Sequence, residues 1–347
     1  MIFKGIEICC PKCRGELYDH RGEENILECR TCRQRYPILV GIPDLRIFSD
    51  PYIGIEEDHA KGLKVADHLH SSTFAELVDF YYRTTSVVPP HHARQYTRGL
   101  LAAEARARAA LDGWEQAIYP KSSGGATRIL EIGCGTAPLL VAAAPRFSLL
   151  VGVDLAFRWL VVAKKRLLEA GLDIPIVCAC AEALPFPDGY FHRVISESSL
   201  EHMKDRRQVM KECRRVLVPG GYFCVSTPNR WSWGPDPQVG VLAGGYWPKR
   251  ILNGYVTWQG GIPPKRDLLS SRTLSMLLRD EGFTDVQIFL PDIADQQKKQ
   301  FGIVFQWVVN LYGLFKRFPV LSSVMFVIGP LLQGIGRKPC ELSAQSR

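Results

Sequence analysis

Residues 127–135 read Thr-Arg-Ile-Leu-Glu-Ile-Gly-Cys-Gly, a short apolar run that ends in a glycine-rich turn. The apolar run predicts a buried strand, and the apolar pattern that begins at Leu139 predicts that the turn leads into a helix. Glycine at positions 133 and 135 allows the backbone to turn sharply and to approach a ligand closely. A Gly-x-Gly pair alone is weak evidence, because this one lacks the third glycine and the lysine of phosphate-binding loops.

The alternation of strand and helix continues toward the C-terminus. Further strands are predicted at 149–154, 174–179, 193–196, 222–227 and 284–290, and helices at 157–170, 205–217 and 271–281. This spacing predicts an α/β fold with a parallel, doubly wound sheet. Ligands of such sheets bind beyond the carboxyl ends of the strands, where four acids fall: Glu131, Asp154, Glu182 and Glu197. Asp154 is placed to accept hydrogen bonds from the two hydroxyl groups of a ribose.

Five segments, in order, resemble the class I S-adenosylmethionine-dependent methyltransferases. They are Glu131-x-Gly-x-Gly135, Asp154, AEALPFPDGYF (181–191), SLEHM (199–203) and RVLVPGG (215–221). The resemblance spans residues 127–290, and the run EHM…VLVPGG…STPNR is similar to the ubiquinone-pathway O-methyltransferases of this class. It implies a Rossmann-like sheet of seven strands, S-adenosylmethionine as the cofactor, and methyl transfer as the reaction.

The same resemblance assigns site residues by position. Glu131 and the turn Gly133-Cys134-Gly135 would surround the methionine moiety of the cofactor. Asp154 would hold the ribose hydroxyls, and Leu155 would lie against the adenine. These roles are expectations that depend on the predicted sheet.

On the adenine side the chain departs from the family. The family usually has Asp before Ala-Glu at the end of the third strand, and this chain has Cys180 there. The adenine contact would therefore pass to the backbone of Ala181 or to Glu182. Ser196 and Glu197 would line the sulfonium side.

A general base is optional for methyl transfer, because the cofactor already carries an activated methyl group. A hydroxyl or phenol acceptor would benefit from one. His202 is the candidate, since imidazole titrates near neutral pH, and Glu197 is a second candidate. The alternative for His202 is a structural hydrogen bond at the start of a helix.

The N-terminus contains two Cys-x-x-Cys pairs, Cys10 to Cys13 and Cys29 to Cys32. This spacing is typical of structural zinc, since four thiolates form a closed tetrahedral site without an open position for substrate. Cys9 is an alternative ligand to Cys10, although the regular gap favours Cys10. Residues 5–47 resemble the zinc-ribbon partner subunit of tRNA and release-factor methyltransferases, and the ribbon fused ahead of many bacterial methyltransferases.

Composition limits the remaining choices. The chain has 347 residues, 46% hydrophobic and 22% charged, which excludes a mostly disordered protein. The net charge of +8 permits contact with nucleic acid or anionic lipid without requiring it. Eleven cysteines, an odd number, disfavour a secreted disulfide framework, so we expect a cytoplasmic protein. The predicted parts are a zinc ribbon (1–47), a linker and helical preface (48–126), the methyltransferase domain (127–290) and an apolar helical tail (291–347).

Two segments outside the motifs bear on the acceptor. Residues 228–270 are rich in Trp and Tyr and predict a lid over an apolar or planar acceptor, with packing against the domain as the alternative. Residues 301–336 are apolar, and residues 318–336 carry no charge. We expect peripheral helices at the inner face of a membrane; a cap on the domain or a homodimer contact are the alternatives.

Together these patterns predict a methyltransferase that acts on oxygen or carbon of a small-molecule or lipid-linked acceptor. An RNA-base methyltransferase that uses the ribbon for recognition is one alternative, disfavoured by the modest charge and the Trp-rich lid. A non-catalytic adapter with the cofactor fold is another, disfavoured by the presence of Glu131, both glycines and Asp154.

Overall fold

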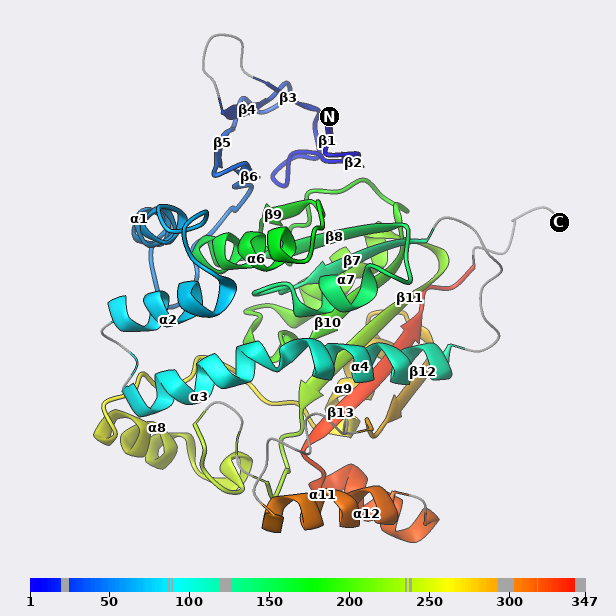
Figure 1. The fold of residues 1–347 in the computed structure, drawn as a ribbon. Coiled ribbons are helices and arrows are strands. Elements are labelled where there is room, and N and C mark those ends of the chain that lie inside the picture. The colour runs from blue at the N-terminus through cyan, green and yellow to red at the C-terminus, as the bar shows by residue number, and fades with distance from the viewer. Residues whose placement is uncertain are drawn as a thin grey trace, which may run out of the picture.

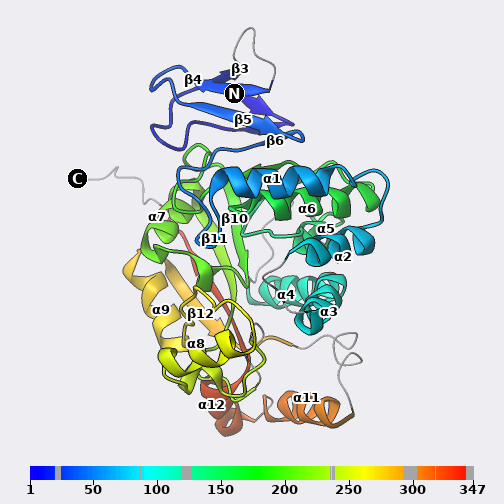
Figure 2. The ribbon, with the colours of Figure 1, turned by 90° about the vertical axis from the view of Figure 1, so that its left-hand side faces the viewer.

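The structure is a computed structural model that describes residues 1–19, 25–85, 88, 90–118, 127–234, 236, 239–292, 303–316 and 318–340. A small ribbon of short strands lies at one end of the molecule, above a central sheet that is covered by helices on both faces (Figures 1 and 2). Residues 119–126, at the end of the predicted helical preface, lie outside the described residues.

The central sheet has seven strands in the order β12-β13-β11-β10-β7-β8-β9. Their bounds are β7 Arg128–Ile132, β8 Leu149–Asp154, β9 Ile176–Cys178, β10 Phe191–Glu197, β11 Leu217–Pro228, β12 Thr284–Phe289 and β13 Leu331–Arg337. The five strands from β7 to β11 pair in parallel, which confirms the predicted doubly wound sheet. Strand order reverses between β7 and β10, and this is where such sheets bind ligands.

Alternation along the strands decides which helices cover which face. Leu130 and Ile132 face the core that contains α7 (Arg206–Val216) and α9 (Ser271–Asp280). Ile129 faces the other core, which contains helices from both sides of the glycine turn. These helices are α1 Ile55–Ala66, α2 Phe74–Thr84, α4 Ala103–Ala117, α5 Pro138–Ala143 and α6 Phe157–Glu169. Because side chains point alternately to opposite faces, a strand of continuous apolar residues is buried on both sides.

The helical preface differs in two ways from the prediction. The linker predicted at the start of residues 48–126 already contains α1, which begins at Ile55. The C-terminal part of the preface is two helices, α3 (Pro90–Leu101) and α4, which are separated at Ala102. Helix α2 agrees with the predicted helical preface, and its first turn is closed by a capping box.

The N-terminal ribbon consists of a two-stranded and a four-stranded sheet. Its strands are β1 Ile2–Phe3, β2 Ile6–Glu7, β3 Leu17–Asp19, β4 Ile26–Cys29, β5 Arg35–Leu39 and β6 Ile42–Pro43. Strands β3 and β4 pair antiparallel, with Leu17 opposite Cys29. Its apolar residues are continuous with the core of the central domain, and the backbone N–H of Leu45 donates to the Cys178 carbonyl at 2.7 Å. The ribbon is therefore packed directly onto the sheet.

The tail contains the predicted helices and, in addition, a strand that was not predicted from the sequence. Helices α11 (Ile303–Phe315) and α12 (Pro319–Ile328) lie at the end opposite the ribbon (Figure 1). Residues 331–337, predicted as part of an apolar helical tail, form β13, which pairs antiparallel with β11 and with β12. Among the described residues, no helix combines the length and the apolar character needed to cross a bilayer.

Candidate functional site

The glycine-rich turn after β7 adopts the backbone that only glycine takes up without strain. Gly133 has φ of +69° and Gly135 has φ of +49°. A Cβ atom at Gly133 would overlap the side chain of Ser199, whereas a Cβ at Gly135 would meet no atom within 4 Å. The turn thus packs tightly on one side and leaves room on the other. Cys134 is buried between the two glycines and donates its backbone N–H to Val153.

Asp154 lies at the carboxyl end of β8 beside this turn. Its Oδ2 accepts the backbone N–H of Gly135 at 2.8 Å, and its Oδ1 accepts that of Ala156 at 2.8 Å. Burial raises the pKa of Asp154, while these two N–H groups oppose the rise by stabilising the charged form. Each carboxylate oxygen retains a lone pair, so the side chain can accept further hydrogen bonds from a diol.

Glu131 is buried at the end of β7 and is 1% exposed. Its Oε2 has no hydrogen-bond partner among the described residues. Burial raises its pKa well above the usual range, and the nearby carboxyls of Glu197 and Asp154 raise it further. Because a buried, unpaired carboxylate is costly, the three acids together favour a positively charged ligand at this point.

The residues predicted to meet an adenine are tied to other parts of the chain. The Cys180 thiol accepts the backbone N–H of Ile47 at 3.4 Å and donates to the Phe48 carbonyl at 3.7 Å. The Glu182 carboxylate accepts the backbone N–H groups of Lys204 at 3.1 Å and Asp205 at 3.3 Å. Cys180 therefore holds the segment that follows the ribbon, and Glu182 holds the loop before α7.

Of the residues predicted to line the sulfonium side, Ser196 is fully buried and its hydroxyl lies 2.8 Å from that of Ser199. Ser199 in turn donates to the Ile132 carbonyl at 3.0 Å, and so connects the ends of β7 and β10. Burial raises the pKa of Glu197, and Arg106 on α4 opposes the rise. These contacts bring strand ends and the helical preface together around one point.

The short helix η1 (Leu200–His202) carries two titratable groups of opposite behaviour. Burial raises the pKa of Glu201 to about 7, and its Oε2 accepts the Thr227 hydroxyl at 3.0 Å. Burial, assisted by Arg266, lowers the pKa of His202 to about 4. The His202 ring is therefore neutral near pH 7 and can accept a hydrogen bond. Sequence reasoning singled out His202 and missed the ionisation of Glu201, which depends on burial.

The segment 228–270, predicted as a lid, contacts the region between the ribbon and α1. The backbone N–H of Lys265 donates to the Tyr52 hydroxyl at 2.6 Å, and that of Asp267 donates to the Glu201 carbonyl at 2.9 Å. A buried ion pair joins Arg266 to Asp236 within the lid. The predicted lid is thus in contact with η1, although part of it, including residues 235, 237 and 238, lies outside the described residues.

A buried ion cluster supports the cofactor side of the site and was not predicted. Its members are Asp44, Arg46, Asp50, Asp58 and Arg158. Asp58 accepts from Arg46 Nη1 and Arg158 Nη1, each at 2.7 Å, and from the backbone N–H of Phe157 at 2.8 Å. Arg46 also donates to the Leu155 carbonyl at 3.0 Å. The cluster therefore fixes the backbone at Leu155 and at Phe157, directly after Asp154.

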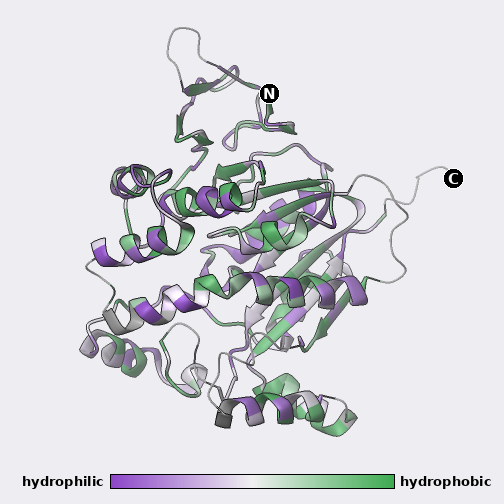
Figure 3. Cartoon of the chain, in the orientation of Figure 1, coloured by the Kyte–Doolittle hydropathy of each residue, from purple (hydrophilic) through white to green (hydrophobic). Residues whose placement is uncertain are grey.

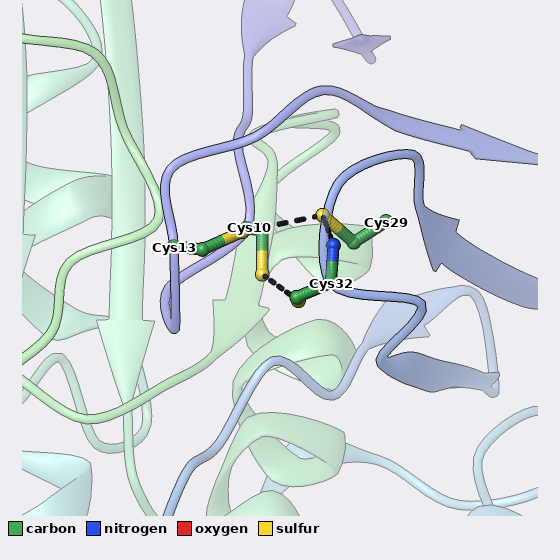
Figure 4. Close-up of side chains that lie close together, drawn as sticks. All are labelled: Cys10, Cys13, Cys29 and Cys32. Carbon is green, nitrogen blue, oxygen red and sulfur yellow. Dashed lines mark hydrogen bonds between the residues drawn. The ribbon is translucent and has the colours of Figure 1, made fainter.

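The four predicted metal ligands come together in the ribbon (Figure 4). The sulfur atoms of Cys10, Cys13, Cys29 and Cys32 all lie within 4.8 Å of one another. Cys9 is outside this group and instead donates its backbone N–H to the Pro185 carbonyl at 2.9 Å. The geometry thus favours Cys10 over Cys9 and is compatible with zinc.

Comparison with known proteins agrees with this geometry. The family model described as "Methyltransferase domain" matches residues 130–225. The chain is 38% identical over 104 residues to a ubiquinone biosynthesis O-methyltransferase of Idiomarina loihiensis, a match that covers 30% of this chain and 43% of that protein. It is 31% identical over 168 residues to a ubiquinone/menaquinone biosynthesis C-methyltransferase of Bordetella avium, covering 47% of this chain and 66% of that protein.

Among solved structures, one similar chain is phosphoethanolamine N-methyltransferase 2 of Haemonchus contortus in complex with S-adenosyl-L-methionine. It has 20% identity and a TM-score of 0.46, and the match covers 66% of this chain and 52% of that chain. A likeness of this size carries no argument about function. The chain likewise spans less than two thirds of the length of each of the two quinone-pathway relatives.

Residues 130–225 match the methyltransferase domain family, and the strand order agrees with the Rossmann-like fold of the class I S-adenosylmethionine-dependent methyltransferases. In the matched part, the sequence is similar to the quinone-pathway O- and C-methyltransferases.

The residues present fit the cofactor of this class. S-Adenosylmethionine carries a sulfonium and an ammonium group, and the unpaired Glu131 oxygen lies among three buried carboxyls that favour positive charge. Asp154 retains acceptor capacity for the ribose, and the open side of Gly135 permits close approach of a ligand.

Proposed function

We propose that this protein transfers a methyl group from S-adenosylmethionine to oxygen or carbon of a small-molecule or lipid-linked acceptor. The observation that carries the proposal is the buried Glu131 carboxylate with its unpaired oxygen beside the glycine turn and Asp154. The match of residues 130–225 to the methyltransferase domain family supports it. The similarity to quinone-pathway enzymes supports oxygen or carbon as the methylated atom.

Each cofactor contact is assigned to a residue of the strand ends. Glu131 would bind the positively charged methionine portion, with the backbone of Gly133, Cys134 and Gly135 around it. Asp154 would accept the ribose hydroxyls, and Leu155 would lie against the adenine. Both N–H groups of the loop before α7 donate to Oε1 of Glu182, so we assign the adenine amine contact to the backbone of Ala181 or to Oε2 of Glu182.

The bound cofactor supplies an electrophilic methyl group. The residues of the chain position the acceptor, exclude water and, for a hydroxyl acceptor, provide a group that accepts the proton. Ser196 and Glu197 would border the methyl group at the end of β10. The lid contacts at Lys265 and Asp267 would exclude water from the acceptor. His202, neutral near pH 7, would accept the proton or a hydrogen bond from the acceptor hydroxyl.

We further propose that the four ribbon cysteines hold a structural Zn²⁺. A closed set of four thiolates has no position for substrate, so the ion would stabilise the ribbon instead of taking part in the reaction. Metal analysis of the purified protein should give one zinc per chain, and the Cys13→Ser, Cys29→Ser double variant should lose it. A chain that purifies without metal and with an intact ribbon would contradict this assignment.

The decisive experiment for methyl transfer is calorimetric titration with S-adenosylmethionine and with S-adenosylhomocysteine. The wild-type chain should bind both, and Asp154→Asn should weaken binding by roughly tenfold to a hundredfold, since a hydrogen bond to a charged group contributes about 1.5–3 kcal/mol. Asp79→Asn, at an exposed pair with Arg83 on α2, is the matched control and should leave binding unchanged. Absence of binding by the wild-type chain would refute the proposal.

A further inference from the structure

A large exposed apolar surface lies at the end of the molecule opposite the ribbon. It is formed by α8 (Lys249–Trp258), α11 and α12, which gather at this end in both ribbon views (Figures 1 and 2). Six side chains illustrate its extent: Ile251 (55% exposed), Trp258 (80%), Trp307 (73%), Leu314 (49%), Val320 (79%) and Val324 (46%). We call this the basal surface. Several large exposed apolar side chains at one end of a molecule mark a docking site more often than isolated exposed ones do.

The two helical segments that form the basal surface carry basic residues and no acidic ones. Residues 239–266 contain two Lys and two Arg, and residues 303–328 contain Lys316 and Arg317; neither segment contains Asp or Glu. Figure 3 shows the hydrophobic character of α12. Three of these cations pair with acids outside the two segments: Lys249 with Asp267, Lys316 with Asp292, and the buried Arg266 with Asp236. Together with the apolar side chains, Arg250 on α8 complements an apolar layer that has an anionic border.

We propose that the basal surface binds the face of an anionic lipid bilayer. Trp258 and Trp307 are amphipathic rings of the kind enriched at membrane interfaces, while the valine and leucine side chains would enter the acyl boundary. Helices α11 and α12 have 13 and 10 residues, too short to cross a hydrocarbon core that needs about 20. They would therefore lie along the surface, with Arg250 of α8 near the headgroups.

The position of α8 connects this surface to the methyl-transfer site. The chain continues from α8 to Lys265 and Asp267, which contact Tyr52 and η1. A membrane bound through α8 would thus lie beside the lid, where an acceptor that resides in the bilayer could enter. This last step rests on the proposed function, whereas bilayer binding itself does not.

The test is co-sedimentation of the full chain with vesicles of phosphatidylcholine alone and of phosphatidylcholine with about one third phosphatidylglycerol. The wild-type chain should bind the anionic vesicles, with weaker binding at high salt. The double variant Trp307→Glu, Val320→Glu should bind at least about tenfold more weakly, because both side chains are exposed and would enter the boundary as charges. Leu168→Glu, at a 48% exposed position on α6, is the matched control and should bind like the wild type.

Failure of the wild-type chain to bind either vesicle would overturn the proposal, as would an equal loss in the control variant. If the basal surface were instead an interface between two copies, analytical ultracentrifugation would show a dimer that the double variant loses, without vesicle binding. Calorimetry with S-adenosylmethionine separates this result from the proposed function, because both variants lie outside the cofactor site and should bind it normally.

Discussion

The buried ion cluster offers a sharp test of how the segment after the ribbon supports the cofactor domain. We predict that Asp58→Asn strongly destabilises the chain. Asp58 is 0% exposed and its carboxylate accepts from two guanidinium groups at 2.7 Å and from the backbone N–H of Phe157 at 2.8 Å. The amide keeps the size of the side chain but removes the charge, which leaves Arg46 and Arg158 less compensated inside the protein.

The expected loss follows from the number of partners that are affected. Removal of one member of a buried ion pair costs about 3–5 kcal/mol, because the remaining charge stays desolvated. Asp44 and Asp50 still face the two arginines, so we expect the lower end of this range, about 3 kcal/mol of unfolding free energy. Cofactor affinity should also fall, since Arg46 holds the Leu155 carbonyl and Asp58 holds the backbone N–H of Phe157, directly after Asp154.

Urea unfolding followed by circular dichroism measures the first quantity, and calorimetry with S-adenosylhomocysteine measures the second. Asp79→Asn, which breaks only an exposed pair on α2, should cost less than about 1 kcal/mol. A loss below about 1 kcal/mol for Asp58→Asn would refute the reasoning, because it would mean that the cluster is hydrated or easily rearranged.

Three further predictions follow from the site and the ribbon. Gly133→Ala should abolish measurable cofactor binding, because Gly133 has φ of +69° and the added Cβ would overlap Ser199. Calorimetry on the folded variant measures this binding, and an unchanged affinity would contradict the prediction. Removal of metal with a chelator should lower the melting temperature of the ribbon-containing chain, and restoration by Zn²⁺ but not by Mg²⁺ would distinguish thiolate from oxygen ligation. The folded-state pKa of Glu201 is raised to about 7, so the contribution of this group to stability is fully present below pH of about 4 and is lost as pH rises through 7. Over this window the unfolding free energy of the wild type should fall relative to that of Glu201→Gln. Parallel curves of unfolding free energy against pH for the two proteins would refute the assignment.

Local sequence patterns were sufficient for the parts of the fold that depend on burial along a single element. The apolar runs Arg128–Ile132 and Leu149–Asp154 are strands of the predicted type, and they lie side by side in the sheet. The capped apolar stripe from Phe74 is a helix. In each case the periodicity of the element itself contains the information.

The strand β13 was missed because its residues do not resemble a buried strand. The segment Leu331–Arg337 contains two glycines and a glutamine, which lower its strand propensity. Gln333 is nevertheless 0% exposed, and its amide donates to the Ala110 carbonyl at 3.1 Å on α4. Gly334 and Gly336 face Ile288 and Phe283 closely, so the lack of side chains permits the packing. These partners are far away in the sequence and could not be inferred locally.

In the candidate site, too, local patterns predicted some residues, and contacts with distant residues determined the others. The positions of Glu131, Asp154 and the four ribbon cysteines follow from motif and spacing, and the structure brings each set together. The ion cluster around Asp58 was read as part of a polar linker, because its partner Arg158 lies 100 residues further along the chain. Polar residues indicate exposure only until their partners are known.

The insertion of β13 between β11 and β12 has a consequence for the order of folding. Strand β12 precedes β13 in the chain, yet the described sheet joins β12 to β11 only through β13. During synthesis, both earlier strands must wait with open edges until residues 331–337 emerge from the ribosome and complete the ladder. A nascent chain halted at α12 would therefore expose unpaired edges of both strands, and such intermediates are expected to need chaperone protection.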